Sequence, residues 1–146
     1  MPEVVQLEPE LVAGLRAEVD AADLPALFGR AMGEVMAGVP AALIAGPIVA
    51  VYHRDDGDHF DVTIGMAVSA APDATGLSVV ELPAGSALRV THRGPYPQLA
   101  DAYAELKTDL EERGLTPTYA WERYLVGPAD VADPADYVTE VITPLS

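Results

Sequence analysis

The chain has 146 residues, of which 50% are hydrophobic and 21% charged, a composition that predicts a folded domain and excludes a disordered chain. Acidic residues outnumber basic ones by 23 to 8, giving a formal net charge of −15. Such a surface repels phosphate backbones, so we expect no direct nucleic-acid binding. Cysteine is absent, which excludes disulfides, thiolate metal sites and cysteine nucleophiles.

Targeting and membrane segments are not evident in the sequence. Residues 1–10 are acidic and lack the basic and apolar regions of a secretory signal. The uncharged stretch 35–52 contains two glycines and two prolines, which is not typical of a membrane-spanning helix. We therefore expect a cytoplasmic protein that does not contact a membrane.

The first half of the chain predicts two strands, a helix and two more strands. Strands are expected at 3–7 and 11–19, then a helix with Asp23 as its cap, then strands at 48–53 and 60–68. Gly29 and Gly33 are expected to let this helix pack closely on the sheet. Residues 53–61 hold two histidines and four aspartates, but Asp-Gly between apolar strands favours a hairpin over a metal site.

The second half predicts the same order of elements. Strands are expected at 77–82 and 86–93, then a helix that stops at Gly114, then strands at 119–126 and 137–142. His92 is interpreted as a strand end before a helix start, in preference to a general base. Phosphate loops and dinucleotide-binding fingerprints are absent, so we expect no cofactor and no metal.

An internal repeat explains why the two halves are alike. Four short matches occur in the same order at offsets of 72 to 76: 4–7 with 79–82, 13–16 with 86–89, 24–27 with 96–99, and 62–63 with 138–139. We predict one domain over residues 1–146, made of two copies at about 1–70 and 77–146 that join near 71–76. The fold class is therefore α+β: duplicated strand-helix-strand-strand units, with an antiparallel sheet, two packed helices and a concave pseudo-twofold groove.

Strand alternation selects the candidate site residues. In the strand 119–126, Glu122 and Tyr124 share one face, and Trp121 lies on the other. The offset of 72 places Tyr52 at the position equivalent to Tyr124. A carboxylate beside two tyrosines suits a flat or cationic ligand, although a solvated glutamate beside half-buried tyrosines remains the alternative. We expect the ligand on the face that the helix leaves open. Trp121 is assigned to packing beneath the sheet, or to the rim of the site if the register slips by one.

Four segments resemble the GyrI-like small-molecule-binding domains, which also serve as effector-binding parts of AraC-type and MerR-type multidrug-sensing regulators. They are VVELP at 79–83, THRGPY at 91–96, WERY at 121–124 and VTEVITP at 138–144. The resemblance is strongest from 79 to 144 and weaker over the first copy. It implies an aromatic groove in which a glutamate, here Glu122, meets lipophilic cations, with Tyr124 two places on. No residues remain for the helix-turn-helix of those regulators, so we expect a stand-alone domain.

Three functions are compatible with this resemblance. The first is a stand-alone protein that captures lipophilic, cationic or aromatic compounds without changing them. The second is a hydrolase that opens cyclopropane rings of DNA-alkylating natural products, with Glu122 activating a water and Tyr124 donating a proton. The third is a protein-interaction or gyrase-modulating module with an unknown protein partner. We rank simple binding first, on the constellation of Glu122, Tyr124 and Tyr52 in an acidic, cysteine-free domain. Binder and enzyme would use the same residues, so only turnover separates them.

Overall fold

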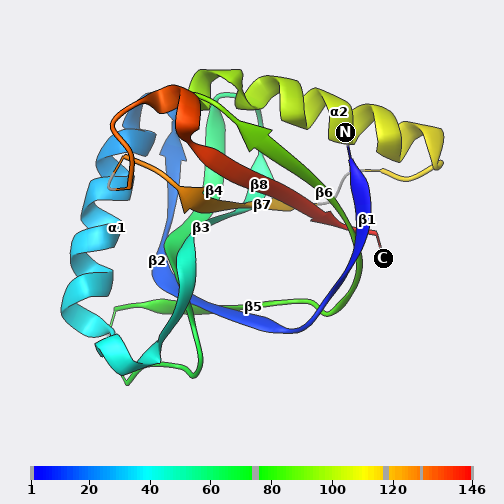
Figure 1. Cartoon of the computed structure of the whole chain (residues 1–146). Helices are drawn as coiled ribbons and strands as arrows, with labels where there is room; N and C mark the ends of the chain where they lie inside the picture. Colours follow the sequence, from blue (N-terminus) through cyan, green and yellow to red (C-terminus); the bar gives the residue numbers. More distant parts are fainter. Residues whose placement is uncertain (1, 74–75, 117–118, 129, 146) are drawn as a thin grey trace. The chain divides into compact units, whose positions relative to one another are not determined.

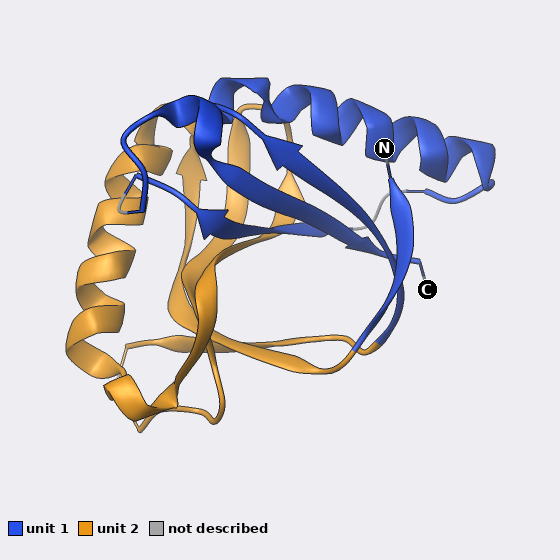
Figure 2. Ribbon diagram, viewed as in Figure 1, with its two compact units in different colours: residues 1–7, 85–146 blue, residues 8–84 orange. Residues whose placement is uncertain are grey.

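The computed structural model describes residues 2–73, 76–116, 119–128 and 130–145 and separates into two compact units. Unit 1 comprises residues 1–7 and 85–146, and unit 2 comprises residues 8–84 (Figure 2). Each unit is a four-stranded antiparallel sheet with one long helix. The predicted α+β class and the duplicated strand-helix-strand-strand arrangement are confirmed.

Unit 2 has the strand order β3-β4-β2-β5. Its elements are β2 (Glu10–Asp20), α1 (Leu24–Gly38), β3 (Ile44–Asp55), β4 (His59–Val68) and β5 (Ser78–Leu82). Helix α1 packs on β2 and β4 (Figure 1). Its buried side chains recur at every fourth position and are Leu27, Ala31 and Val35.

Unit 1 has the strand order β1-β6-β8-β7. Its elements are β1 (Glu3–Leu7), β6 (Gly85–Arg93), α2 (Leu99–Glu112), β7 (Ala120–Val126) and β8 (Val138–Pro144). Helix α2 packs on β6. Its apolar side chains form one core with those of the sheet: Leu88, Val90, Leu99, Ala102, Leu106, Leu110 and Val141.

The first strand of each sequence repeat pairs in the unit formed by the other repeat. Strand β1 pairs with β6, with Leu7 opposite Gly85, and β5 pairs with β2, with Leu82 opposite Glu10. The links between β1 and β2 and between β5 and β6 are two residues long and contain proline, without the turn residues of a two-residue hairpin. Each chain segment therefore passes on into a different unit instead of folding back.

The chain passes from one unit to the other at these two links, whereas the joint predicted at 71–76 concerns the two sequence copies and stays a prediction. Residues 74 and 75 of that joint lie outside the described residues. That the whole chain forms one domain stays a prediction.

The predicted stop of the second helix is present, whereas the predicted side-chain cap of the first helix is not. Asp23 occupies the position before α1, but its side chain makes no capping hydrogen bond there. Gly114 follows α2 with φ 71°. Its N–H donates to the Glu111 carbonyl at 3.0 Å, and the Leu115 N–H donates to the Leu110 carbonyl at 2.9 Å. This pair of bonds is a Schellman stop, which glycine favours because it tolerates the left-handed region.

Two expectations about local structure have opposite outcomes. The hairpin between β3 and β4 is confirmed: Gly57 has φ 94°, and the Asp56 N–H donates to the His59 carbonyl at 2.9 Å. The packing role of Gly29 and Gly33 is wrong, because both are exposed and a side-chain carbon there would have no atom within 4 Å. At 100° per residue, both glycines lie on the side of α1 opposite to the buried Leu27, Ala31 and Val35.

Candidate functional site

A buried glutamate in β7 is the centre of the candidate site in unit 1. Glu122 is only 5% exposed. Tyr124, two residues along the same strand, donates its hydroxyl to Oε1, and Tyr103 of α2 donates its hydroxyl to Oε2. Both carboxylate oxygens are therefore hydrogen-bonded, as a buried charge requires. Glu122 and Tyr124 share a face, as strand alternation predicts.

That face is the one covered by helix α2. Glu122 lies opposite Val141 in the β7–β8 register, and Val141 belongs to the core beneath α2. The expectation that the site would use the face opposite the helix is therefore wrong for Glu122. Alternation determines which side chains lie together, but only tertiary packing determines which face the helix covers.

Three tyrosine rings extend the site beyond Glu122. The ring of Tyr96 lies edge-on to that of Tyr124, with centroids 5.7 Å apart, and is tilted against that of Tyr137 at 5.1 Å. Burial raises the pKa of the Tyr96 phenol, and the nearby Tyr137, Glu122 and Asp130 raise it further. The Tyr96 hydroxyl thus stays protonated and can donate a hydrogen bond at neutral pH.

We call Tyr96, Tyr103, Tyr124 and Tyr137 the tyrosine cluster. Of these four, sequence reasoning selected only Tyr124 for the site. Tyr103 had a visible signal, because it lies on the apolar face of the second helix and is its only residue there with a hydroxyl. Tyr96 and Tyr137 flank a helix start and a strand start, where no periodicity places a side chain on a particular face.

The registers support the predicted correspondence of Tyr52 with Tyr124. Tyr52 pairs with Val62 in unit 2, Tyr124 pairs with Thr139 in unit 1, and an irregularity follows each tyrosine directly. These pairs align Val62 with Thr139, one residue away from the predicted match of 62–63 with 138–139. The Tyr52 ring contacts Phe60 edge-on, with centroids 5.5 Å apart. Ala50 stands where unit 1 has Glu122, so the first copy lacks the carboxylate. Participation of Tyr52 in the site stays a prediction.

Trp121 lies in the interior, on the face of β7 opposite to Glu122. It is 2% exposed and opposite Ile142, and its ring is 5.8 Å from that of Tyr119. The register is regular from Trp121 to Tyr124, so the strand shows no slip that would turn the indole toward the glutamate. Trp121 is thus buried on the face of the sheet that α2 does not cover, and its assignment to packing or to the rim of the site stays a prediction.

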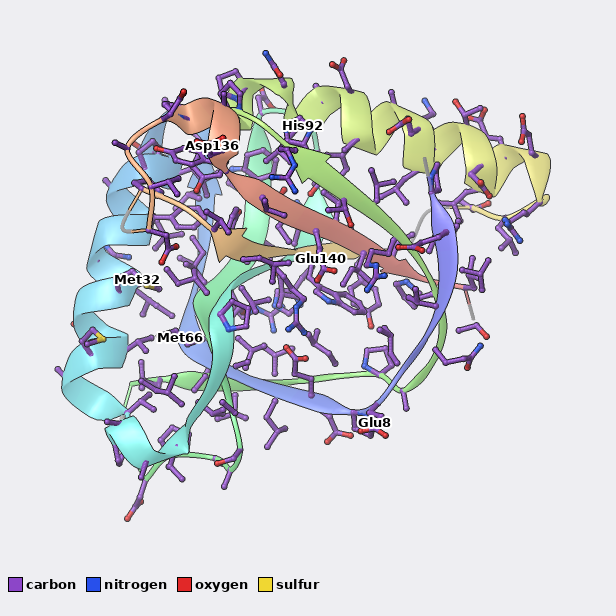
Figure 3. The ribbon with its side chains drawn as sticks, in the orientation of Figure 1. Glu8, Met32, Met66, His92, Asp136 and Glu140 are labelled. Atoms are coloured by element: carbon purple, nitrogen blue, oxygen red, sulfur yellow. The ribbon has the colours of Figure 1, made fainter. Side chains whose placement is uncertain are left out.

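Ion pairs cross the same face as Trp121. Glu140 of β8, labelled in Figure 3, lies 3.4 Å from Arg123 and 3.2 Å from Arg89, which is in turn 2.7 Å from Glu3. The pairs connect all four strands of unit 1. Arg89 and Glu3 are partly exposed whereas the Glu140 side chain is only 13% exposed, and we interpret the pairs as links between the strands.

His53 begins the segment 53–61, for which the sequence favours a hairpin over a metal site, and it lies in unit 2. His53 Nε2 is 2.8 Å from Thr63 Oγ1, and Thr63 is fully buried. Arg16 donates two hydrogen bonds to Asp61 nearby, at 3.1 and 2.9 Å. Burial lowers the pKa of His53, and Arg16 lowers it further while Asp61 opposes. Among the described residues, no group of three histidine, aspartate or glutamate side chains is placed to hold a metal ion.

This lowered pKa of His53 predicts loss of stability in mild acid. Above an unfolded-state pKa of about 6.5 the imidazole is neutral in both states, and as the pH falls below it the unfolded chain takes up the proton first. We expect His53→Gln, which keeps an N–H toward Thr63, to lose less stability than the wild type between pH 7 and pH 5. Urea midpoints at the two pH values measure this, and equal losses would contradict it. His59, whose pKa is raised, is present in both the wild type and the variant, so its contribution to the pH dependence cancels in the comparison.

A family model described as the GyrI-like small molecule binding domain matches residues 1–146. The chain belongs to the GyrI-like family. It is therefore a small-molecule-binding domain, as the resemblance in the sequence had implied. No curated protein matches the sequence. In the described residues, no helix of this GyrI-like domain is long and apolar enough to cross a membrane.

Solved structures of similar fold include a protein–DNA complex and a complex with tetraphenylphosphonium. The EcmrR C-terminal domain is 25% identical over 99% of this chain and 96% of its own, with a TM-score of 0.83. EcmrR in its complex with DNA is 24% identical over 99% of this chain, with a TM-score of 0.82; the GyrI-like chain spans 56% of that protein. SAV2435 bound to tetraphenylphosphonium is 12% identical over 100% of this chain and 94% of its own, with a TM-score of 0.74. Since a similar domain occurs in a DNA complex, the expected absence of nucleic-acid binding stays a prediction.

Proposed function

We propose that this GyrI-like domain binds lipophilic aromatic cations at Glu122. The observation that carries the proposal is a carboxylate only 5% exposed, held by two tyrosine hydroxyls and bordered by aromatic rings. A carboxylate removed from water attracts a cation more strongly than an exposed one, and tyrosine faces add cation–π attraction. The complex of SAV2435 with tetraphenylphosphonium, a cation of this class, supports the choice.

The two hydroxyls have a defined part in this proposal. In the unliganded domain they satisfy the carboxylate, so Glu122 tolerates burial. A bound cation provides the compensating charge instead, while the tyrosine rings pack against its apolar groups. Tyr52 stays a proposed second aromatic contact, and Trp121 is proposed to stabilise β7 from its opposite face.

Glu122→Gln is expected to weaken tetraphenylphosphonium binding about tenfold or more, corresponding to roughly 1.4 kcal/mol or more of binding free energy. The amide keeps the shape and an acceptor for a tyrosine hydroxyl but removes the charge that faces the cation. Isothermal titration calorimetry measures the affinity. The matched control is Glu112→Gln at the exposed end of α2, which changes net charge equally. Equal affinities of the two variants would show that Glu122 is not the binding carboxylate.

The direct hydrogen bond from Tyr124 to Glu122 favours one alternative, a hydrolase. In this reaction Glu122 takes a proton from water, the water oxygen bonds to one cyclopropane carbon, the strained C–C bond breaks, and a tyrosine protonates the released carbon or its conjugated oxygen. Incubation with a cyclopropane-bearing alkylator and mass spectrometry of the mixture distinguishes the two functions. Unchanged compound in complex supports binding, and ring-opened product in excess over protein supports hydrolysis.

A further inference from the structure

One polar atom beside the candidate site has no hydrogen-bond partner in the described structure. Thr139 of β8 is 0% exposed, and its Oγ1 is among the few buried side-chain oxygens without a partner. Leaving a buried hydroxyl unpaired is unfavourable, and valine would fill the same space without that cost. The hydroxyl therefore needs an explanation that the free domain does not supply.

The strand registers place Thr139 next to Glu122. Thr139 lies opposite Tyr124 of β7 and opposite His92 of β6, the residue labelled near the end of β6 in Figure 3. Two residues further along β8, Val141 lies opposite Glu122. Since residues two apart in a strand share a face, the Thr139 hydroxyl is on the same side of the sheet as the Glu122 carboxylate.

Two tyrosines of the tyrosine cluster flank Thr139 in the sheet and in the chain, and a third contacts both of them. The Tyr96 ring contacts both Tyr124, which is opposite Thr139, and Tyr137, which precedes it by two residues. All three tyrosines are partly exposed, whereas Thr139 is completely buried. A ligand that displaces these rings on its way to Glu122 therefore uncovers an unpaired hydroxyl.

We propose that Thr139 Oγ1 is a ligand-contacting atom that selects cations carrying an aromatic amine. The amine N–H donates a hydrogen bond to Oγ1, while the delocalised positive charge of the same molecule faces Glu122. Threonine suits this role because its hydroxyl has two acceptor positions. The inference rests on the proposed function, since it concerns a second contact in the same site. It assigns the site a preference that charge and aromatic surface alone do not provide.

Two phenanthridinium cations test the preference. Ethidium carries two aromatic amines, and 5-ethyl-6-phenylphenanthridinium has the same ring system and charge without them. Thr139→Val is expected to weaken ethidium binding about threefold to tenfold, as loss of one net hydrogen bond implies, and to leave the amine-free cation unchanged. Thr139→Ser, which keeps the hydroxyl, is expected to retain the preference. Fluorescence titration of all three proteins with ethidium, and calorimetry with both cations, gives the affinities.

Thermal unfolding of the unliganded variants provides an independent measurement. Thr139→Val is expected to unfold at the same temperature as the wild type or a higher one, because it removes an unpaired buried hydroxyl. Unfolding several degrees lower would show that the hydroxyl has a structural partner, and it would overturn the inference. The inference would also be overturned if Thr139→Val weakened the binding of both cations equally or of neither. It would likewise be overturned if the wild type did not bind ethidium.

The Glu122→Gln variant separates this inference from the proposed function. If that variant binds both cations as tightly as the wild type, the proposed function is wrong. If it weakens both while Thr139→Val leaves the preference for ethidium intact, the proposed function stands and the inference about Thr139 fails.

Discussion

Gly65→Ala is expected to lower the free energy of unfolding by about 3 kcal/mol or more. Gly65 of β4 lies opposite Gly14 of β2, and a side-chain carbon on Gly65 would be 1.9 Å from the Ala13 carbonyl oxygen. Gly14→Ala, the same change on the opposite strand, meets a similar obstacle, because a side-chain carbon on Gly14 would be 2.2 Å from the Ile64 carbonyl oxygen. Both obstacles are backbone atoms, so the two strands must separate locally to admit a methyl group.

Chemical denaturation followed by far-ultraviolet circular dichroism measures this loss. The matched control is Gly29→Ala, the same change on the exposed surface of α1 where no atom lies within 4 Å. It is expected to stabilise the protein by about 0.5–1 kcal/mol, because alanine favours the helix over glycine. Similar stabilities for Gly65→Ala and the wild type would mean that the strands do not approach closely at this pair.

Trp121→Ala is expected to cost about 3–5 kcal/mol of unfolding free energy, the usual range for emptying a buried tryptophan site. Trp121 is the only tryptophan in the chain and is 2% exposed. Trp121→Phe leaves a smaller cavity and is expected to cost less. Circular dichroism in urea is the appropriate measurement, because both variants remove the fluorescent reporter.

The conservative variant also tests whether Trp121 contacts ligand. If Trp121 only packs, Trp121→Phe binds tetraphenylphosphonium with unchanged affinity despite its lower stability. A clear loss of affinity in this folded variant would restore the rim role that its burial argues against.

Local patterns were sufficient for most element boundaries. The sequence predicted a strand at 86–93 that the structure extends by one residue, as β6 (Gly85–Arg93), and a helix stopping at Gly114, which is α2 (Leu99–Glu112). These signals are local, since each depends on the backbone repeat of its own segment. The exchange of β1 and β5 between units was not predicted, because pairing partners depend on contacts distant in sequence.

The candidate site shows the same division between local and tertiary information. Alternation brought Glu122 and Tyr124 together, and the repeat offset identified Tyr52 as the equivalent of Tyr124. The donor from Tyr103 was missed, since it comes from a helix whose rotation on the sheet is set by packing. Thr139 was missed because an unpaired hydroxyl becomes visible only when every neighbouring donor and acceptor has been placed.

The sequence by itself determined the α+β class, the duplication, the acidic surface and the strand that carries Glu122, because composition and periodicity are properties of short segments. Only the tertiary structure decided that Glu122 faces helix α2 and that each of its carboxylate oxygens accepts a tyrosine hydroxyl. It also decided that Thr139, on the same face, has no hydrogen-bond partner for its hydroxyl among the described residues. Those facts depend on how the α2 side chains meet the sheet, and close packing between elements is a collective property of many distant residues.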